Sequence, residues 1–217
     1  MTWDDLSKPW QAALSEAWTA YCAGSLPIGC AIADREDNIL FTGRNRLHED
    51  DPPHGLLAGN HLAHAEMNAL APLRKQSIDP KQCVLYTTME PCPMCTGAIR
   101  MTHIGAVHYA ARDPVAGSIG LLDATPFMRR GGITVTGPVQ SQLETFSVAL
   151  TIAAFLELHA GTDLPVRIMT SYQPHVPDAV HLGQLLHDTG SLKRLCDGGY
   201  PADVVFRDVL GEIKPTA

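Results

Sequence analysis

Two short motifs restrict the possible folds of this chain more than any other feature. The first is His64-Ala65-Glu66, and the second is the run Pro-Cys-Pro-Met-Cys at residues 91–95. Each motif stands where a helical pattern begins, and the second follows directly on a predicted strand. Because Cys92 and Cys95 are three residues apart, one helical turn places both sulfur atoms on the same side. If the motifs act together, the fold must bring the beginnings of two helices close to each other.

The residue types in these motifs are those of a catalytic zinc site. Zinc favours sulfur and imidazole ligands, and His64, Cys92 and Cys95 supply three of them. The fourth position stays open for water, which is typical of catalytic rather than structural zinc. Glu66 follows His64 by two residues, where a carboxylate can border the same pocket and transfer protons. We therefore predict one Zn²⁺ per chain, with these three ligands and Glu66 as the catalytic residue.

Less specific interpretations apply to each motif alone. A Cys-x-x-Cys pair can be a redox pair or a coincidence, and a single histidine on a helix is usually structural. The combined pattern, with Cys92 placed 28 residues after His64, is the signature of zinc deaminases. His54 and His61 lack a glutamate two residues later, and we expect His61 to face solvent or to orient a neighbour. The other cysteines have no metal-binding spacing and are expected to be buried thiols: Cys22, Cys30, Cys83 and Cys196.

Apolar periodicity predicts an α/β domain in the first half of the chain. Two strand–helix–strand connections favour parallel pairing, and the whole pattern predicts three layers. The expected elements are a helix at 10–21, a hairpin of strands at 28–33 and 39–42, a helix at about 62–73, a strand at 84–88, a helix at 92–102 and a strand at 106–111.

The pattern is less regular after residue 120. We interpret residues 133–139 and 166–172 as strands, and residues 143–159 as a long helix that is apolar on nearly every side. Residues 179–187 read as a short helix with Asp178 as its cap. No linker separates a second domain, so we expect a core at residues 1–120 and an extension at 121–217 that packs on the core and does not fold independently.

Charge and targeting signals restrict the partners. The 217 residues carry a net charge of −7, and neither the part up to residue 120 nor the part after it has a basic excess. A broad phosphate-binding face needs clustered Lys and Arg, so nucleic acid is disfavoured. The first nine residues lack the apolar run of a signal peptide, and the most apolar stretch, at 146–158, is too short to span a bilayer. We expect a cytoplasmic protein without a membrane partner.

The chain resembles the zinc-dependent cytidine and deoxycytidylate deaminase superfamily, nearest the branch of guanine, fungal-type cytosine and tRNA adenosine deaminases. The resemblance covers roughly residues 27–120. Besides the two motifs, it rests on Leu-Pro-Ile-Gly-Cys-Ala-Ile at 26–32, Gly-Arg-Asn at 43–45 and Ala-Ala-Arg-Asp at 110–113. It implies a three-layer α/β/α cytidine-deaminase-like fold with a central mixed five-stranded sheet. It also implies a homodimer or a higher homo-oligomer.

The resemblance further implies roles for individual residues. His64, Cys92 and Cys95 would bind zinc, and Glu66 would transfer protons during hydrolytic deamination. Asn45 would bind the substrate base, although a side-chain-to-backbone bond in a turn is the simpler interpretation of that residue. The backbone N–H of Ala65 would face the substrate, and Glu90 is interpreted as structural.

The acidic balance favours a small substrate. We expect hydrolytic deamination of an aminated purine or pyrimidine base, a nucleoside or a related heterocycle, with release of ammonia. Two alternatives stay open: a tRNA-specific adenosine deaminase, and a catalytically silent zinc-binding module. The tail after residue 120 has no recognisable chemical motif. Core packing is the expected role of its aromatic residues Phe127 and Tyr172, although these and His175 are candidates to line a pocket.

Overall fold

A five-stranded mixed sheet forms the centre of the protein in the computed structural model, which describes residues 1–50, 54–73, 78–139 and 142–211. The strand order is β2-β1-β3-β4-β5. β1 pairs antiparallel with β2 and β3, whereas β3–β4 and β4–β5 pair in parallel, as the crossover connections predict. The strands are β1 (Gly29–Ala33), β2 (Ile39–Arg44), β3 (Val84–Met89), β4 (Ala106–Ala111) and β5 (Thr134–Thr136).

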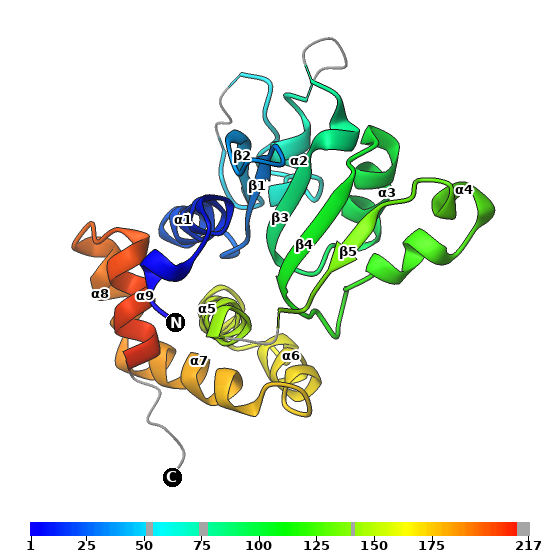
Figure 1. Ribbon diagram of the computed structural model, residues 1–217. Coiled ribbons are helices and arrows are strands. Elements are labelled where there is room, and N and C mark those ends of the chain that lie inside the picture. Colours follow the sequence, from blue (N-terminus) through cyan, green and yellow to red (C-terminus); the bar gives the residue numbers. More distant parts are fainter. Residues whose placement is uncertain (51–53, 74–77, 140–141, 212–217) are drawn as a thin grey trace.

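Helices cover both faces of the sheet, so the predicted α/β fold with its five-stranded sheet is confirmed (Figure 1). α1 (Lys8–Cys22) and α5 (Gln142–Leu158) lie on one face. α2 (Ala65–Leu70) and α3 (Pro93–Thr102) lie on the other. β5 is shorter than the predicted strand at 133–139, because Gly137 and Pro138 follow Thr136 and a proline has no N–H to continue the ladder.

Two glycines on the hairpin allow α1 and α2 to approach the sheet closely. A Cβ built on Gly29 would lie 2.0 Å from the backbone oxygen of Ala13 in α1. A Cβ built on Gly43 would lie 2.4 Å from the backbone oxygen of Ala65 in α2. Gly29 pairs with Arg44 and Gly43 with Cys30, so the two glycines occupy adjacent positions of the ladder and point to opposite faces.

The chain beyond the sheet is entirely helical in its described part, and here one prediction was wrong. Residues 166–172 lie in a helix, α6 (Leu164–Tyr172), and not in a strand. Pro165 occupies the first turn, where a proline is well tolerated, and the buried residues Pro165, Ile168 and Tyr172 are spaced by three and four. The other helices here are α7 (Pro177–Thr189), α8 (Ser191–Asp197) and α9 (Ala202–Gly211).

The boundaries of two other helices differ from the prediction. α7 begins at Pro177, so Asp178 lies in its first turn and Val176 is the cap. α2 is shorter than predicted, because Leu62 lies in a turn in which its N–H donates to the Asn60 side chain. Shorter helical turns complete the chain at Trp3–Asp5, Pro80–Gln82, Ile119–Asp123 and Pro126–Arg129, the last of which is α4.

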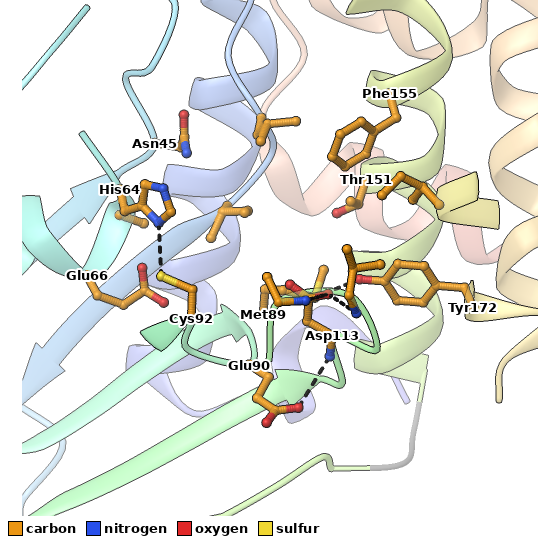
Figure 2. A pocket seen from close by; sticks show the side chains of 16 residues that line it. Asn45, His64, Glu66, Met89, Glu90, Cys92, Asp113, Thr151, Phe155 and Tyr172 are labelled. Carbon is orange, nitrogen blue, oxygen red and sulfur yellow. Dashed lines mark hydrogen bonds between the residues drawn. The ribbon is translucent and has the colours of Figure 1, made fainter. Parts of the chain in front are cut away.

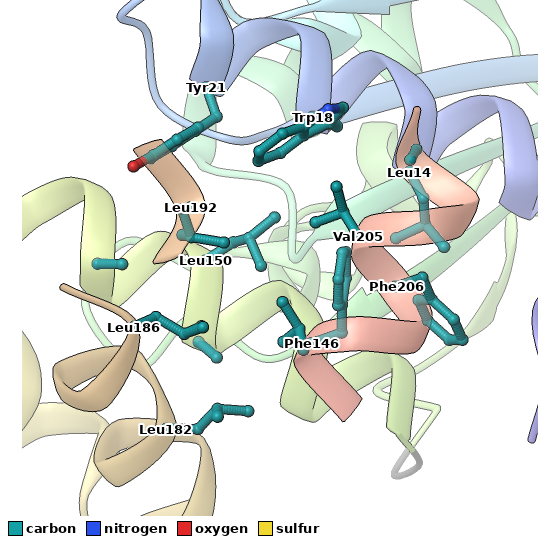
Figure 3. Packing of buried hydrophobic residues seen from close by; sticks show 14 of the residues in the cluster. Leu14, Trp18, Tyr21, Phe146, Leu150, Leu182, Leu186, Leu192, Val205 and Phe206 are labelled. Carbon is teal, nitrogen blue, oxygen red and sulfur yellow. The ribbon is translucent and has the colours of Figure 1, made fainter. Parts of the chain in front are cut away.

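An apolar cluster joins α7, α8 and α9 to α1 and α5 (Figure 3). Each of these helices contributes fully buried side chains, among them Leu14, Phe146, Leu150, Leu186 and Phe206. The Trp18 indole N–H also donates to the backbone oxygen of Tyr200 at 2.8 Å. Helices α7, α8 and α9 therefore contact α1 and α5, the two helices that lie on this face of the sheet.

Two of the cysteines expected to be free thiols form a disulfide. Cys22 at the end of α1 is bonded to Cys196 in α8, and their Cα atoms are 5.6 Å apart. Cys30 and Cys83 are buried free thiols as expected. Disulfides persist mainly in oxidising compartments, so this bond gives no support to the cytoplasmic prediction. No described helix combines the length and apolarity required to cross a membrane. Self-association stays a prediction.

Candidate metal centre and active site

The three predicted metal ligands come together at the beginnings of α2 and α3. Figure 2 shows two of them, His64 and Cys92. His64 and Cys92 are the N-cap residues of the two helices, both in extended conformation, and Cys95 lies one turn into α3. The Nδ1 atom of His64 is 3.6 Å from the sulfur of Cys92 and 3.6 Å from that of Cys95. All three ligand atoms lie within 4.8 Å of one another.

The local environment favours a thiolate at this cluster. Hydrogen bonds from Cys95 and His64 lower the pKa of Cys92 to about 4. The same pairing with the Cys92 sulfur, together with burial, raises the pKa of Cys95. The N-terminus of α3, with Pro93 in its first turn, adds unpaired N–H groups that stabilise negative charge. Two sulfurs and one imidazole nitrogen at these separations fit the ligand preference of Zn²⁺.

Glu66 is buried directly beside the cluster, with 3% of its surface exposed. One carboxylate oxygen accepts a hydrogen bond from the Thr87 hydroxyl at 3.2 Å, and the other accepts from the Cys95 thiol at 3.3 Å. Burial raises the pKa of this carboxyl above its ordinary value. A carboxyl group with a raised pKa can both accept and donate protons near neutral pH.

Asn45 lies on the opposite side of His64 from Glu66 and is 1% exposed. Its side-chain oxygen accepts the N–H of Leu47 at 3.0 Å, which is the turn interaction considered from the sequence. Figure 2 shows the amide nitrogen on the side of His64. Behind Asn45, Arg44 and Arg46 both donate to one carboxylate oxygen of Glu49, at 2.8 and 2.6 Å. The turn thus fixes the side chain while one end of its amide stays available to a ligand.

A cavity of about 170 Å³ adjoins these groups. All of the predicted site residues line this cavity except Cys95, which is fully buried. The lining residues are Leu26, Ile28, Asn45, His64, Ala65, Glu66, Met89, Glu90, Cys92, Asp113, Val115, Ala116, Thr151, Phe155, Ile168 and Tyr172.

Several candidate residues have other positions or roles. His54 and His61 are exposed, as is His175. Phe127 is 45% exposed and packs beneath the Arg100 guanidinium. Glu90 accepts the backbone N–H groups of Asp113 and Ile119 with its two carboxylate oxygens, which agrees with a structural role.

Sequence reasoning missed the partner of Glu66 and most of one cavity wall. Thr87 lies on β3 and gives no signal of its own in the sequence. The cavity residues of α5 and α6 lie more than 55 residues beyond the second motif. The alternation of β3 could have placed Thr87 on the same face of the sheet as α2. Tyr172 was a candidate from the sequence, but core packing was the preferred interpretation for it.

Residues 4–111 match the family model for the cytidine and deoxycytidylate deaminase zinc-binding region. The guanine deaminase of Bacillus subtilis is 33% identical over 118 residues, which are 51% of this chain and 70% of that protein. The tRNA-specific adenosine deaminase of Aquifex aeolicus is 34% identical over 111 residues, or 50% of this chain and 68% of the relative. The cytosine deaminase of Candida albicans is 40% identical over 100 residues, which are 46% of this chain and 61% of that protein.

The chain spans only part of other curated relatives, such as 19% of a Deinococcus radiodurans tRNA(Ile)-lysidine synthase that is 34% identical over 119 residues. Among solved structures, a variant of the protein NE0047 in complex with 8-azaguanine is 25% identical, with a TM-score of 0.52. The alignment covers 69% of this chain and 85% of that one. It therefore extends past the segment that matches the family model.

Proposed function

Because this chain belongs to the cytidine and deoxycytidylate deaminase family, we propose that it hydrolyses the C–N bond of an aminated nucleobase, nucleoside or related heterocycle and releases ammonia. The observation that carries the proposal is the arrangement around one cavity. A metal-binding cluster of His64, Cys92 and Cys95 stands next to the buried carboxyl of Glu66, and both adjoin a space lined mainly by apolar side chains.

The ligand set supports zinc as the metal. Zn²⁺ held by His64, Cys92 and Cys95 would act as a Lewis acid and make water a nucleophile near neutral pH. Two thiolates balance the charge of the ion, and the lowered pKa of Cys92 supports the first of them. We propose one ion per chain.

Each remaining residue then has a defined task. The Glu66 carboxylate accepts one proton from the attacking water and delivers it to the ring nitrogen. It then accepts the proton of the hydroxyl group now bonded to the ring carbon and delivers it to the leaving amine, which departs as ammonia. The Asn45 amide binds the ring and orients it toward Glu66. The N–H of Ala65 belongs to the first turn of α2, where it has no acceptor within the helix, and it faces the substrate. The apolar lining limits the access of bulk water to the ring.

The test separates metal binding from catalysis. Wild-type protein and Glu66→Gln should be loaded with zinc, and zinc content and ammonia release should be measured with a panel of bases and nucleosides. We expect the variant to keep its zinc and to lose roughly 10²–10⁴-fold in turnover. Asn38→Asp, an exposed substitution in the β1–β2 turn, serves as a control that should keep full turnover. Ammonia release by Glu66→Gln at the wild-type rate would disprove the assignment.

The tRNA relatives supply the second candidate function, that of a nucleic-acid editing enzyme. Against it, the cavity has no Lys or Arg among the residues that line it, and the whole chain is acidic. A gel shift with tRNA at physiological salt separates the two functions, because phosphate contacts dominate such binding. Editing of tRNA adenosine by a protein that leaves every free base and nucleoside unchanged would favour the second candidate. A protein that binds zinc and lacks both activities would be a silent zinc-binding module.

A further inference from the structure

The cavity has a second wall, made by the extension. Figure 2 shows Thr151 and Phe155 of α5 and Tyr172 of α6 across the cavity from His64, Glu66 and Cys92. Ile168 of α6 completes this surface, which we name the α5–α6 wall. It lies outside residues 4–111, the segment that the family model matches. A substrate whose amine points toward the metal cluster would present its opposite edge to this wall.

The Tyr172 hydroxyl is a buried donor with a poor partner. The residue is 2% exposed, and its hydroxyl donates to the Met89 thioether sulfur at 3.3 Å. Thioether sulfur is a weak acceptor, and a buried hydroxyl favours a better one. Burial also raises the pKa of Tyr172 well above its ordinary value, so the group keeps its proton. It is therefore available to donate to a substrate acceptor in the cavity.

The Thr151 hydroxyl offers the complementary function. Its proton is already donated to the Ser147 backbone oxygen at 2.8 Å, one helical turn earlier. The oxygen keeps lone pairs that can accept a hydrogen bond from the cavity side. Phe155 lies next to Thr151 on α5 and provides a flat apolar surface. The α5–α6 wall thus combines one donor, one acceptor and an aromatic face.

Size and charge restrict what can occupy this space. A cavity of about 150 Å³ in another protein holds one benzene molecule, so about 170 Å³ is suited to a base and not to a base with its ribose. The charged groups that line the cavity are carboxylates, namely Glu66, Glu90 and Asp113, together with His64. Phosphate recognition relies on Arg, Lys or clustered N–H groups, so this lining disfavours a nucleotide.

We propose that the α5–α6 wall makes this protein selective for free, unphosphorylated nucleobases, with Tyr172 and Thr151 as specificity-determining residues. The ring N–H of a free base donates to Thr151, and a neighbouring ring acceptor receives the Tyr172 proton. In a nucleoside the sugar replaces that N–H, which removes the donor and adds bulk against Phe155. This inference rests on the proposed deamination for the orientation of the ring.

Binding is the primary measurement, because it does not depend on turnover. Zinc-loaded Glu66→Gln protein is titrated calorimetrically with cytosine, guanine and adenine and with the corresponding nucleosides and 5′-monophosphates. We expect at least one base to bind, with its nucleoside and nucleotide at least about tenfold weaker. In the same background, Tyr172→Phe and Thr151→Val each weaken binding of that base by about tenfold. Tyr86→Phe removes a buried hydroxyl that bonds Asp37 outside the cavity, and it leaves the affinity unchanged.

The outcomes separate this inference from the proposed function. Bases that bind in the expected pattern but are not deaminated by the wild-type protein would leave the wall assignment intact and overturn the function. Deamination combined with wild-type affinity in both wall variants, or with equal affinity for base and nucleoside, would overturn the wall assignment alone. Absence of binding by every compound in the panel would overturn both. Melting temperatures of the variants show whether a loss of affinity reflects a loss of folding.

Discussion

The orientation of the Glu66 carboxylate depends on a hydrogen bond from Thr87. Thr87 is fully buried on β3, and its hydroxyl is the only described side-chain donor to the carboxylate besides the Cys95 thiol, which a bound metal would deprotonate. Its neighbour Thr88 points to the other face, where its hydroxyl oxygen accepts the N–H of Gly29. Thr87 is therefore a positioning residue for the proton transfer assigned to Glu66.

Replacement of Thr87 tests this arrangement. Thr87→Val keeps the shape of the side chain and leaves one Glu66 oxygen without its donor, so we expect kcat for ammonia release to fall about tenfold with little change in KM. Thr87→Ser keeps the hydroxyl and should retain most of the wild-type kcat. If the serine and valine variants lose the same amount, the hydroxyl has no positioning role.

Tyr86 makes stability depend on pH in the alkaline range. Burial and the nearby Asp37 raise the pKa of Tyr86 to about 12 from an ordinary value of 10.0. Between pH 10 and 12 the folded state therefore binds more protons than the unfolded state, and the free energy of unfolding falls as pH rises. The contribution of Tyr86 to the free energy of unfolding is complete below pH 10. It decreases by about 1.4 kcal/mol per pH unit between pH 10 and pH 12.

Urea unfolding at pH 9, 10 and 11 measures this dependence. Tyr86→Phe should show a shallower decline than wild type, because it removes one of the titrating groups. Tyr200→Phe changes an exposed tyrosine and should decline as wild type does. Equal slopes for wild type and Tyr86→Phe would contradict the assignment.

At the scale of elements, α2 can lie close to β2 only because residue 43 is a glycine, which has no side chain. A methyl group on Gly43 would lie 2.4 Å from the backbone oxygen of Ala65 and 2.4 Å from the backbone nitrogen of Ala69. Backbone atoms cannot rotate away, so α2 would have to move from the sheet. His64 and Glu66 would move with it, away from the cysteines that α3 holds.

We therefore expect Gly43→Ala to weaken zinc binding and to lower the free energy of unfolding by roughly 1–3 kcal/mol. Gly97→Ala is the matched control, because a Cβ at Gly97 meets nothing within 4 Å and the residue lies inside α3. That variant should keep its zinc and gain about 0.5–1 kcal/mol from a better helix former. Zinc affinity in Gly43→Ala equal to that of the control would show that α2 tolerates the displacement.

The elements also show which structure the sequence could predict. β3, α3 and β4 were predicted within a residue or two, since short apolar runs alternate there with a proline-started helix. The strand predicted at 166–172 is wrong because a short run with β-branched Val and Ile fits either a strand or a helix, whereas Pro165 just before it is typical of a helix start. α9 could also be predicted from the sequence, because its apolar residues recur at helical spacing: Ala202, Val205, Phe206 and Val209.

The candidate site also has one part that the sequence could predict and one part that it could not. The metal cluster could be predicted because its ligands have a fixed spacing in two local motifs. The α5–α6 wall could not be derived, because Thr151 and Tyr172 reach the cavity only through the packing of α5 on the sheet and of α6 on α5. The hydrophobic effect is not directional, so the same apolar helix surfaces could be buried in many different arrangements, and the sequence does not select one of them.

At the scale of the whole molecule, the far wall of the cavity depends on how firmly the extension is attached. α1 is the common support, since it packs against the hairpin on one side and joins the apolar cluster of α5, α7 and α9 on another (Figure 3). The Tyr21 hydroxyl donates to Glu157 of α5 at 2.7 Å, and Trp18 binds the backbone at Tyr200. We expect the extension not to fold when it is separated from residues 1–120.

The Cys22–Cys196 disulfide closes a loop of 174 residues between α1 and α8, and its removal tests this attachment. A closed loop restricts the unfolded chain, so we expect the Cys22→Ala/Cys196→Ala variant to lose about 2–4 kcal/mol of unfolding free energy in urea. Zinc content should be unchanged, because the disulfide includes neither Cys92 nor Cys95. A reductant should lower the stability of wild type to that of the variant and leave the variant as it is. Wild-type protein that unfolds at the same urea concentration with and without reductant would show that the bond does not stabilise the fold. The apolar cluster and the hydrogen bond from Trp18 to Tyr200 would then hold α8 and α9 against α1.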